Sequence, residues 1–447
     1  MTGNPENRLA QACLFGSVAM LGKALQIRDG FYDETALTWL TAALLLCAVA
    51  VFTLKWPVIT SARLELLPRS VAALAITWHV ALLLTKSPGM YLQPRANIQW
   101  FNAGVVVLAA LALVGIAGLK PLARLWFPPL LAVHFALGVW MIHASPAPAI
   151  DVVVVHREAI DAMKAGRSPY AINFENIYSP ESGFYNPEAV AGNRVMFGYP
   201  YPPLNLLAAA PARWIAGDYR YAQLTAWIVA AALVGFMGQG MISKLAAVLL
   251  LMQPRGFFVL EQGWTEPLAI CMLALTLFAI ARVPALAAWT GGLLIVAKQY
   301  LVLAVPLLWR FAAGRPGLRG FVVRAVLVGA LVTLPFVIWS PRAFIESVLL
   351  LQLREPVRLD SLSYLSWIVR QGFGAGSFVW AAAAASVALV LTILVTPNTP
   401  AGFAASLAFS SFLAFAFGSK AFCNYYFFVA GAMCCAVAAS QSEKPKA

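Results

Sequence analysis

The interval from Asp151 to Arg220 organises this chain. It begins DVVVVHREAIDAMKAGRSPYAINFENIYS at residues 151–179 and contains FGYPYPPLNLLAAAPARW at residues 197–214. It is the longest polar interval of a very apolar chain, and apolar runs long enough to cross a bilayer lie on both sides of it. We therefore expect this interval to be held at a membrane surface.

The composition is that of an integral membrane protein. Of 447 residues, 61% are hydrophobic and only 11% are charged, whereas about a quarter of the residues of a soluble domain are charged. A backbone within lipid must satisfy its own hydrogen bonds, which favours helices. We predict an all-α polytopic membrane protein, a helical bundle with about 11 to 14 membrane segments, some of them broken or re-entrant. The six cysteines lack CxxC spacing, so we expect neither a zinc site nor a disulfide framework.

The distribution of charge predicts an orientation. The formal net charge is +13, but the basic residues fall mainly in short connections between apolar runs, which is the positive-inside pattern and requires no nucleic acid. With a cytoplasmic N-terminus, the connection at residues 120–124 lies inside and the acidic turn at residues 29–34 lies outside. The loops at residues 144–200 and 341–373 and the turn near Lys420 then all face the non-cytoplasmic side.

The external loop at residues 144–200 is expected to contain one interfacial helix. Apolar residues recur there at three- and four-residue spacing, which predicts an amphipathic helix: Val152, Val155, Ala159, Ile160 and Met163. Gly166 to Pro169 should end this helix, and we expect residues 173–193 to form an external loop, either ordered or mobile. The Tyr199 to Pro203 run should then lead into the membrane, because the apolar run 204–216 follows it.

Two apolar stretches contain interruptions that suggest a cavity. Residues 244–262 include Pro254 and Arg255, and residues 287–309 include Lys298. Each stretch is either one crossing helix that carries a costly ionisable residue or a pair of half-helices that enters and returns. Pro and Gly next to ionisable residues favour broken helices that line a cavity.

Asp151 has two interpretations. It stands at the junction between a membrane helix and the interfacial helix, where a carboxylate could take a proton from the hydroxyl group of an acceptor. It could equally cap the helix that follows, since Asp is a favoured N-cap residue. The sequence leaves both interpretations open.

Several cations are candidates to bind an anionic group. Lys298 lies in the middle of an apolar run, where an ionisable residue usually faces a cavity or a partner, and a phosphate is one natural partner. Arg354, Arg358 and Lys420 could clamp phosphate oxygens or lie against lipid headgroups. His156 has no second ligand at metal-binding spacing, so we expect no metal site. Motifs for soluble nucleotide chemistry, such as DxD, a Walker loop or GxGxxG, are absent from the sequence.

These motifs, in this order, resemble a known family. Asp151 with AGRSPY and FGYPYPPLNLL is similar to the signature of glycosyltransferase family 87 in the GT-C superfamily, which transfers mannose from polyprenyl phosphate. EQGWTEPLAICMLAL, GGLLIVAKQYLVLAVPLLW, RLDSLSYL and SKAFCNYYFF resemble its later motifs. The resemblance covers about residues 125–440. It implies a GT-C-like catalytic module, preceded by additional N-terminal transmembrane helices at residues 1–124 and followed by a cytoplasmic tail at residues 441–447.

The resemblance also implies a reaction and a set of site residues. Asp151 would act as general base in an inverting transfer of a hexose or pentose, mannose above all, from a polyprenyl-phosphate-linked sugar to a lipid-linked or envelope glycan acceptor. No cofactor is implied, and the oligomeric state is left open. The expected site is the non-cytoplasmic face, in a bacterial inner membrane. The expected substrate-binding residues are Lys298, Arg354, Arg358, Lys420, Tyr201, Gln262, Glu266, Asn424 and Tyr425.

Two other classes of function remain open from the sequence. A transporter or flippase of a lipid-linked solute would also use broken helices and a buried lysine, although the sequence contains no evident internal repeat and gathers its polar residues on one side. A scaffold of the same fold that binds a partner without catalysis is the third hypothesis.

Overall fold

The structure of this chain, a computed structural model, describes residues 8–55, 62–118, 125–179, 183–238, 240–314, 317–354, 356–374 and 378–442. The connection at residues 120–124, which we expect in the cytoplasm, lies outside this part of the chain. The same holds for residues 443–447 of the expected cytoplasmic tail.

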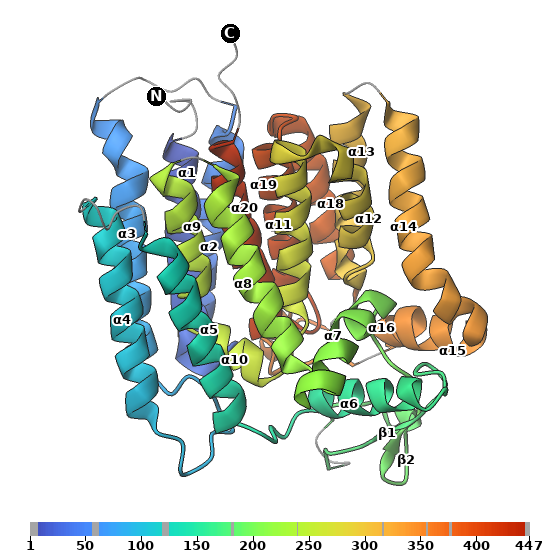
Figure 1. Cartoon of the computed structure of the whole chain (residues 1–447). Coiled ribbons are helices and arrows are strands. Elements are labelled where there is room, and N and C mark those ends of the chain that lie inside the picture. Colours follow the sequence, from blue (N-terminus) through green and yellow to red (C-terminus); the bar gives the residue numbers. More distant parts are fainter. Residues whose placement is uncertain are drawn as a thin grey trace.

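Long helices stand side by side and form the body of the molecule (Figure 1). In chain order they are α1 (Arg8–Arg28), α2 (Glu34–Thr53), α3 (Ala62–Thr85), α4 (Ile98–Ala117), α5 (Phe127–Ala144), α8 (Arg220–Met237), α11 (Glu266–Arg282), α14 (Leu318–Trp339), α18 (Phe378–Val395), α19 (Pro400–Ala416) and α20 (Cys423–Ser440). Within the described residues, eight helices are long and apolar enough to cross a membrane: α1 to α5, α8, α14 and α20. The predicted all-α class, with helices of the length and composition of membrane spans, is confirmed.

Two further stretches of the bundle are interrupted helices, as the sequence predicted. Helices α9 (Met241–Leu251) and α10 (Gly256–Glu261) are separated at Pro254, whose missing N–H and fixed φ interrupt a helix. Helix α12 (Ala287–Ile295), after the 3₁₀ turn η5 (Pro284–Leu286), is separated from the 3₁₀ turn η6 (Gln299–Leu303) and α13 (Ala304–Ala313) by extended backbone at Lys298.

The two interruptions have different geometries. Helices α9 and α10 together run from one end of the bundle to the other, since α9 follows the end of α8 and Glu261 of α10 bonds to the loop after α3. Helices α12 and α13 enter and return: α12 follows the end of α11, and Arg310 of α13 donates to Thr396 at the same end of the bundle. The stretch at residues 244–262 therefore crosses the bundle, although it is broken at Pro254. The stretch at residues 287–309 forms a pair of half-helices that enters and returns.

A layer of short elements covers the end of the bundle opposite the first turn of α1 and the last turn of α20 (Figure 1). It contains α6 (Asp151–Lys164), β1 (Phe174–Glu175), the 3₁₀ turn η4 (Pro187–Ala189), β2 (Val190–Ala191), β3 (Arg194–Val195), α7 (Pro203–Ala216), α15 (Pro341–Ile345), the π-helical turn η7 (Glu346–Leu350), α16 (Leu351–Arg354) and α17 (Tyr364–Arg370). The three strands form an antiparallel sheet of order β1-β3-β2, with Phe174 opposite Val195 and Val190 also opposite Val195.

The layer adds detail to one prediction and differs from another. The segment 173–193 contains β1 and β2, and both strands pair with β3, which follows this segment directly. The run 204–216 forms α7, a helix of 14 residues that packs on α6 within the layer. At about 1.5 Å per residue this helix is too short for a hydrocarbon core of about 30 Å. The amphipathic helix α6 is as predicted, with Val155, Ala159 and Ile160 buried.

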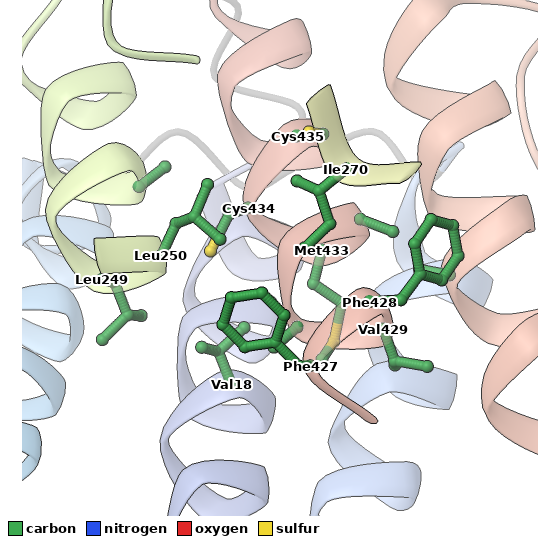
Figure 2. Packing of buried hydrophobic residues seen from close by; sticks show 14 of the residues in the cluster. Val18, Leu249, Leu250, Ile270, Phe427, Phe428, Val429, Met433, Cys434 and Cys435 are labelled. Carbon is green, nitrogen blue, oxygen red and sulfur yellow. The ribbon is translucent and has the colours of Figure 1, made fainter. Parts of the chain in front are cut away.

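Helix α20 is the centre of the hydrophobic core. Figure 2 shows Phe427, Met433, Cys434 and Cys435 of α20 among side chains from α1, α9 and α11, including Val18. All six cysteines are free, and five of them are buried. Because α1 packs against α20 in the same core cluster, the N-terminal helices are integral to the bundle. The predicted division between residues 1–124 and 125–440 stays a prediction about function.

Candidate functional site

A cavity of about 260 Å³ lies where the layer meets the ends of the bundle helices. We call it the Asp151 cavity. Eight of the ten predicted site residues line it: Asp151, Tyr201, Gln262, Lys298, Arg358, Lys420, Asn424 and Tyr425. They come from α6, the loop before α7, the end of α10, the break between α12 and α13, the loop before α17 and the start of α20. The fold therefore gathers residues that are up to several hundred positions apart around one space.

A smaller outer cavity, of about 120 Å³, adjoins the first. It shares Asp151, Val152, Tyr185, Tyr201, Lys420 and Tyr425 with the Asp151 cavity and is otherwise lined by residues of the layer, such as Leu351. Asp151 thus borders both cavities.

Asp151 is the first residue of α6, preceded by the N-cap residue Ile150. Its Oδ1 accepts from the backbone N–H of Val152 at 2.8 Å, and its Oδ2 accepts from the hydroxyl of Tyr185 at 2.6 Å. Burial and the Asp151 carboxylate raise the pKa of Tyr185, so this hydroxyl keeps its proton and donates it. Asp151 is therefore the residue after the N-cap and not the N-cap itself, and it lines the cavity.

Lys298 is a buried member of an ion pair. Its Nζ lies 3.1 Å from Oε1 of Glu266, and the two side chains are 6% and 0% exposed. Nζ also donates to the hydroxyl of Thr265 and lies 4.4 Å from the centre of the Tyr201 ring. Glu266, predicted to bind substrate, does not line the Asp151 cavity. The Glu266 carboxylate instead neutralises the Lys298 ammonium, because the start of α11 lies against the break between α12 and α13.

The remaining predicted cations fall into two groups. Arg358 lines the cavity, where its guanidinium lies 3.9 Å from the Phe184 ring and forms a two-point contact with Asp360, at 2.9 and 2.7 Å. Burial lowers the pKa of Lys420 to about 7, and the negative charge of Asp151 acts in the opposite direction. Arg354 is not part of this cavity. It lines an adjoining groove of about 390 Å³ in the layer, which shares Tyr185 with the Asp151 cavity, so its predicted role in the site stays a prediction.

Carboxylates accompany the cations around the Asp151 cavity. Glu266 pairs with Lys298 and Asp360 pairs with Arg358, while Lys420 lies in the field of Asp151. The space is therefore not the simple pocket of positive charge that the sequence suggested. Ion pairs at its rim hold the cations in place, and an anionic group that entered would compete with carboxylates for them.

Two carboxylates important to this cavity were not singled out as site residues by the sequence. Glu261 is fully buried and accepts from the backbone N–H groups of Met90 and Tyr91 at 2.6 and 2.7 Å, which anchors the loop after α3 beside the cavity. Asp29 lines the cavity from the turn between α1 and α2. The only signal in the sequence was an acidic residue at the end of a membrane helix, which also fits a solvated turn.

His156 of α6 is buried and belongs to a cluster of aromatic side chains. Its ring stacks on Tyr219 at 4.5 Å, its Nδ1 lies 2.9 Å from the carbonyl oxygen of Val152, and its Nε2 lies 2.9 Å from the hydroxyl of Tyr199. Burial lowers the pKa of His156 to about 3, so the ring is neutral. Because a carbonyl oxygen can only accept, Nδ1 donates to Val152 and Nε2 accepts from Tyr199.

We expect His156 to make stability depend on pH. The folded protein excludes a proton that the unfolded chain binds below its ordinary pKa of about 6.5. Stability is therefore complete above pH 6.5 and falls as the pH decreases toward 3, by up to about 1.4 kcal/mol per pH unit. In thermal unfolding of the purified protein from pH 8 to 4.5, His156→Phe should lack this component, so its Tm should approach that of the wild type as the pH falls. His143→Phe, at an exposed position of α5, is the control, and a constant difference for His156→Phe would contradict the assignment.

The described residues contain no group of three or more His, Cys, Asp or Glu side chains that could hold a metal ion. Comparison of the chain with models of protein families, with curated proteins and with solved structures gave no match. The class of protein thus rests on the fold and the cavity alone: an all-α protein with membrane-length helices and a cavity with charged side chains in its wall at one end of the bundle.

Proposed function

We propose that this protein is a membrane glycosyltransferase of the GT-C type. It moves a sugar, mannose above all, from a polyprenyl-phosphate donor to a lipid-linked or envelope glycan acceptor. The observation that carries this proposal is the Asp151 cavity, which combines the Asp151 carboxylate with Lys298, Arg358 and Lys420 at the ends of apolar helices. A lipid phosphate would meet such a cavity just below the membrane interface, with its chain in the bilayer.

The proposed arrangement in the membrane follows from the fold and the charge pattern. We infer that α9 with α10, α11, α18 and α19 cross the membrane in addition to the eight helices of sufficient length, and that α12 and α13 form a re-entrant pair. The positive-inside pattern supports a non-cytoplasmic position for the layer and the Asp151 cavity. The expected location is a bacterial inner membrane with the site facing the periplasm.

The proposed reaction is a single displacement with inversion. Asp151 accepts the proton of the acceptor hydroxyl as that oxygen bonds to the anomeric carbon. The bond between the anomeric carbon and the phosphate oxygen breaks, and the polyprenyl phosphate leaves with the electron pair. Lys298, Lys420 and Arg358 stabilise the charge on the departing phosphate. Tyr185 donates to Oδ2 of Asp151 at 2.6 Å and holds the carboxylate toward the cavity.

Transport of a lipid-linked solute is the second candidate function. The break between α9 and α10 and the half-helix pair α12 and α13 favour it, because discontinuous helices form the binding sites of many transporters. Alternating access also requires a path to the opposite end. The Asp151 cavity is lined by residues at one end of the bundle, which favours transfer over transport.

The two candidates are distinguished with the purified full chain in proteoliposomes. Polyprenyl-phosphate mannose is supplied with a lipid-linked glycan acceptor, and both release of polyprenyl phosphate and movement of the labelled donor between leaflets are measured. Release that depends on the acceptor supports the proposed enzyme. Movement between leaflets without release would support the transporter. If neither release nor movement is observed, a non-catalytic scaffold is favoured. Mass spectrometry of the lipids that accumulate in cells lacking the chain would identify the natural donor.

A further inference from the structure

The turn between α1 and α2 brings a second carboxylate into the Asp151 cavity. Asp29 lines this cavity, and its side chain is 16% exposed. Gln262 and Lys298 line the Asp151 cavity together with Asp29, and none of these three residues lines the outer cavity. Asp29 therefore borders the same space as Lys298, where the donor would lie.

The backbone at Asp29 has an unfavourable conformation that the fold maintains. Its φ is +57°, and among the described residues it is the only one other than glycine with a positive φ. The next residue, Gly30, has φ +80°, and a Cβ there would meet the backbone nitrogen of Cys423 at 2.4 Å. The turn is thus pressed against the start of α20. Left-handed backbone in a residue with a side chain costs energy and is often found at functional sites.

Two cations fix the orientation of the Asp29 carboxylate. Lys86 Nζ lies 2.8 Å from Oδ1 and 2.9 Å from Oδ2, and Arg255 Nη1 lies 2.9 Å from Oδ1. Arg255 is 2% exposed and also donates to the carbonyl oxygen of Ser87. Neither Lys86 nor Arg255 lines the cavity. They orient the Asp29 side chain, and of these three residues Asp29 alone lines the cavity.

The contacts of Asp29 leave room for one more hydrogen-bond donor. A carboxylate offers about four acceptor positions, and the contacts from Lys86 and Arg255 use three of them, two on Oδ1 and one on Oδ2. The negative charge of the carboxylate would repel a phosphate. A sugar hydroxyl, in contrast, can donate to the remaining position on Oδ2.

We propose that Asp29 binds hydroxyl groups of the donor's sugar and so selects the glycosylated lipid over the bare polyprenyl phosphate. This inference rests on the proposed function, because it needs the sugar of the donor to lie in the Asp151 cavity. It also assigns a role to the N-terminal helices: the pair α1 and α2 supplies one wall of the site.

The test compares binding of two lipids, a short-chain polyprenyl-phosphate mannose and the same polyprenyl phosphate without the sugar. Loss of a hydrogen bond to a charged group weakens binding by about tenfold to a hundredfold. Asp29→Asn should weaken binding of the mannosylated lipid by this factor and leave binding of the bare phosphate within about threefold. Asparagine tolerates the left-handed backbone, so the substitution changes the charge more than the turn.

Charge-matched variants separate this role from a structural one. Asp29→Asn combined with Lys86→Gln keeps the net charge of the cluster at its wild-type value and should show the same selective loss. Lys86→Gln alone keeps the carboxylate and its contact with Arg255, and it should keep the preference for the mannosylated lipid. Equal losses for both lipids, or no loss for either, would overturn the inference and leave the proposed function standing. Failure of the wild type to bind either lipid would overturn both.

Discussion

Replacing Asp151 with asparagine should reduce sugar transfer by about a hundredfold to ten-thousandfold, the range that a positioned general base contributes. Asparagine has nearly the same shape, and its oxygen can still accept from Val152 or Tyr185, which bond to the carboxylate at 2.8 and 2.6 Å. It cannot take a proton from the acceptor. The change should therefore affect the chemical step and leave binding of the polyprenyl-phosphate donor almost unchanged.

The measurement is single-turnover release of polyprenyl phosphate, with donor affinity determined separately. Asp161→Asn is the matched control, because Asp161 is on the same helix, is half-exposed and pairs with Arg213 at the surface at 3.1 Å. Exposed ion pairs contribute about 1 kcal/mol or less, so this control should retain transfer. Unimpaired transfer by the Asp151 variant would refute the assignment of the base.

Replacing Lys298 with alanine should destabilise the protein by about 3 to 5 kcal/mol, the usual cost of leaving a buried charge without its partner. Glu266 is fully buried, and its Oε1 lies 3.1 Å from Lys298 Nζ. Without the ammonium, the carboxylate loses its compensating charge in an environment that excludes water. Donor affinity should fall as well if Lys298 contacts the phosphate.

A double variant separates these two effects. Lys298→Met with Glu266→Gln removes both charges, and replacement of a buried ion pair by uncharged groups is often neutral for stability. Thermal unfolding should therefore recover toward the wild type, while the apparent Kd for the donor should remain raised. A single Lys298 variant as stable as the wild type would contradict the ion pair. A double variant that binds the donor normally would contradict the phosphate role.

The partners of the cations explain why the site could be only partly predicted. Lys298 stood out in the sequence because an ionisable residue in an apolar run is costly. That reasoning identified the residue and its burial but not its neighbour, and Glu266, chosen from a motif, proved to be the neighbour rather than part of the cavity wall. Arg354 shows a related limit. It is close in sequence to Arg358, yet it lines the adjoining groove in the layer and not the Asp151 cavity.

Asp29 shows a second limit of sequence reasoning. An aspartate at the end of a membrane helix normally indicates a solvated turn, and nothing nearby in the sequence distinguishes it. Arg255, its partner, is 226 positions away along the chain. The significance of Asp29 appears only when the ends of α1, α3 and α10 meet beside the start of α20.

The sequence by itself determined the class of fold, the amphipathic helix α6 and the two interrupted stretches. Hydropathy, helical periodicity and the effect of proline act over a few neighbouring residues, so they can be read along the chain. Only the tertiary structure decided which charges face one another, which interrupted stretch traverses the bundle and which returns, and that the N-terminal helices form part of the cavity wall. Ion pairing and cavity formation depend on distances in space between distant segments, and packing around α20 sets those distances.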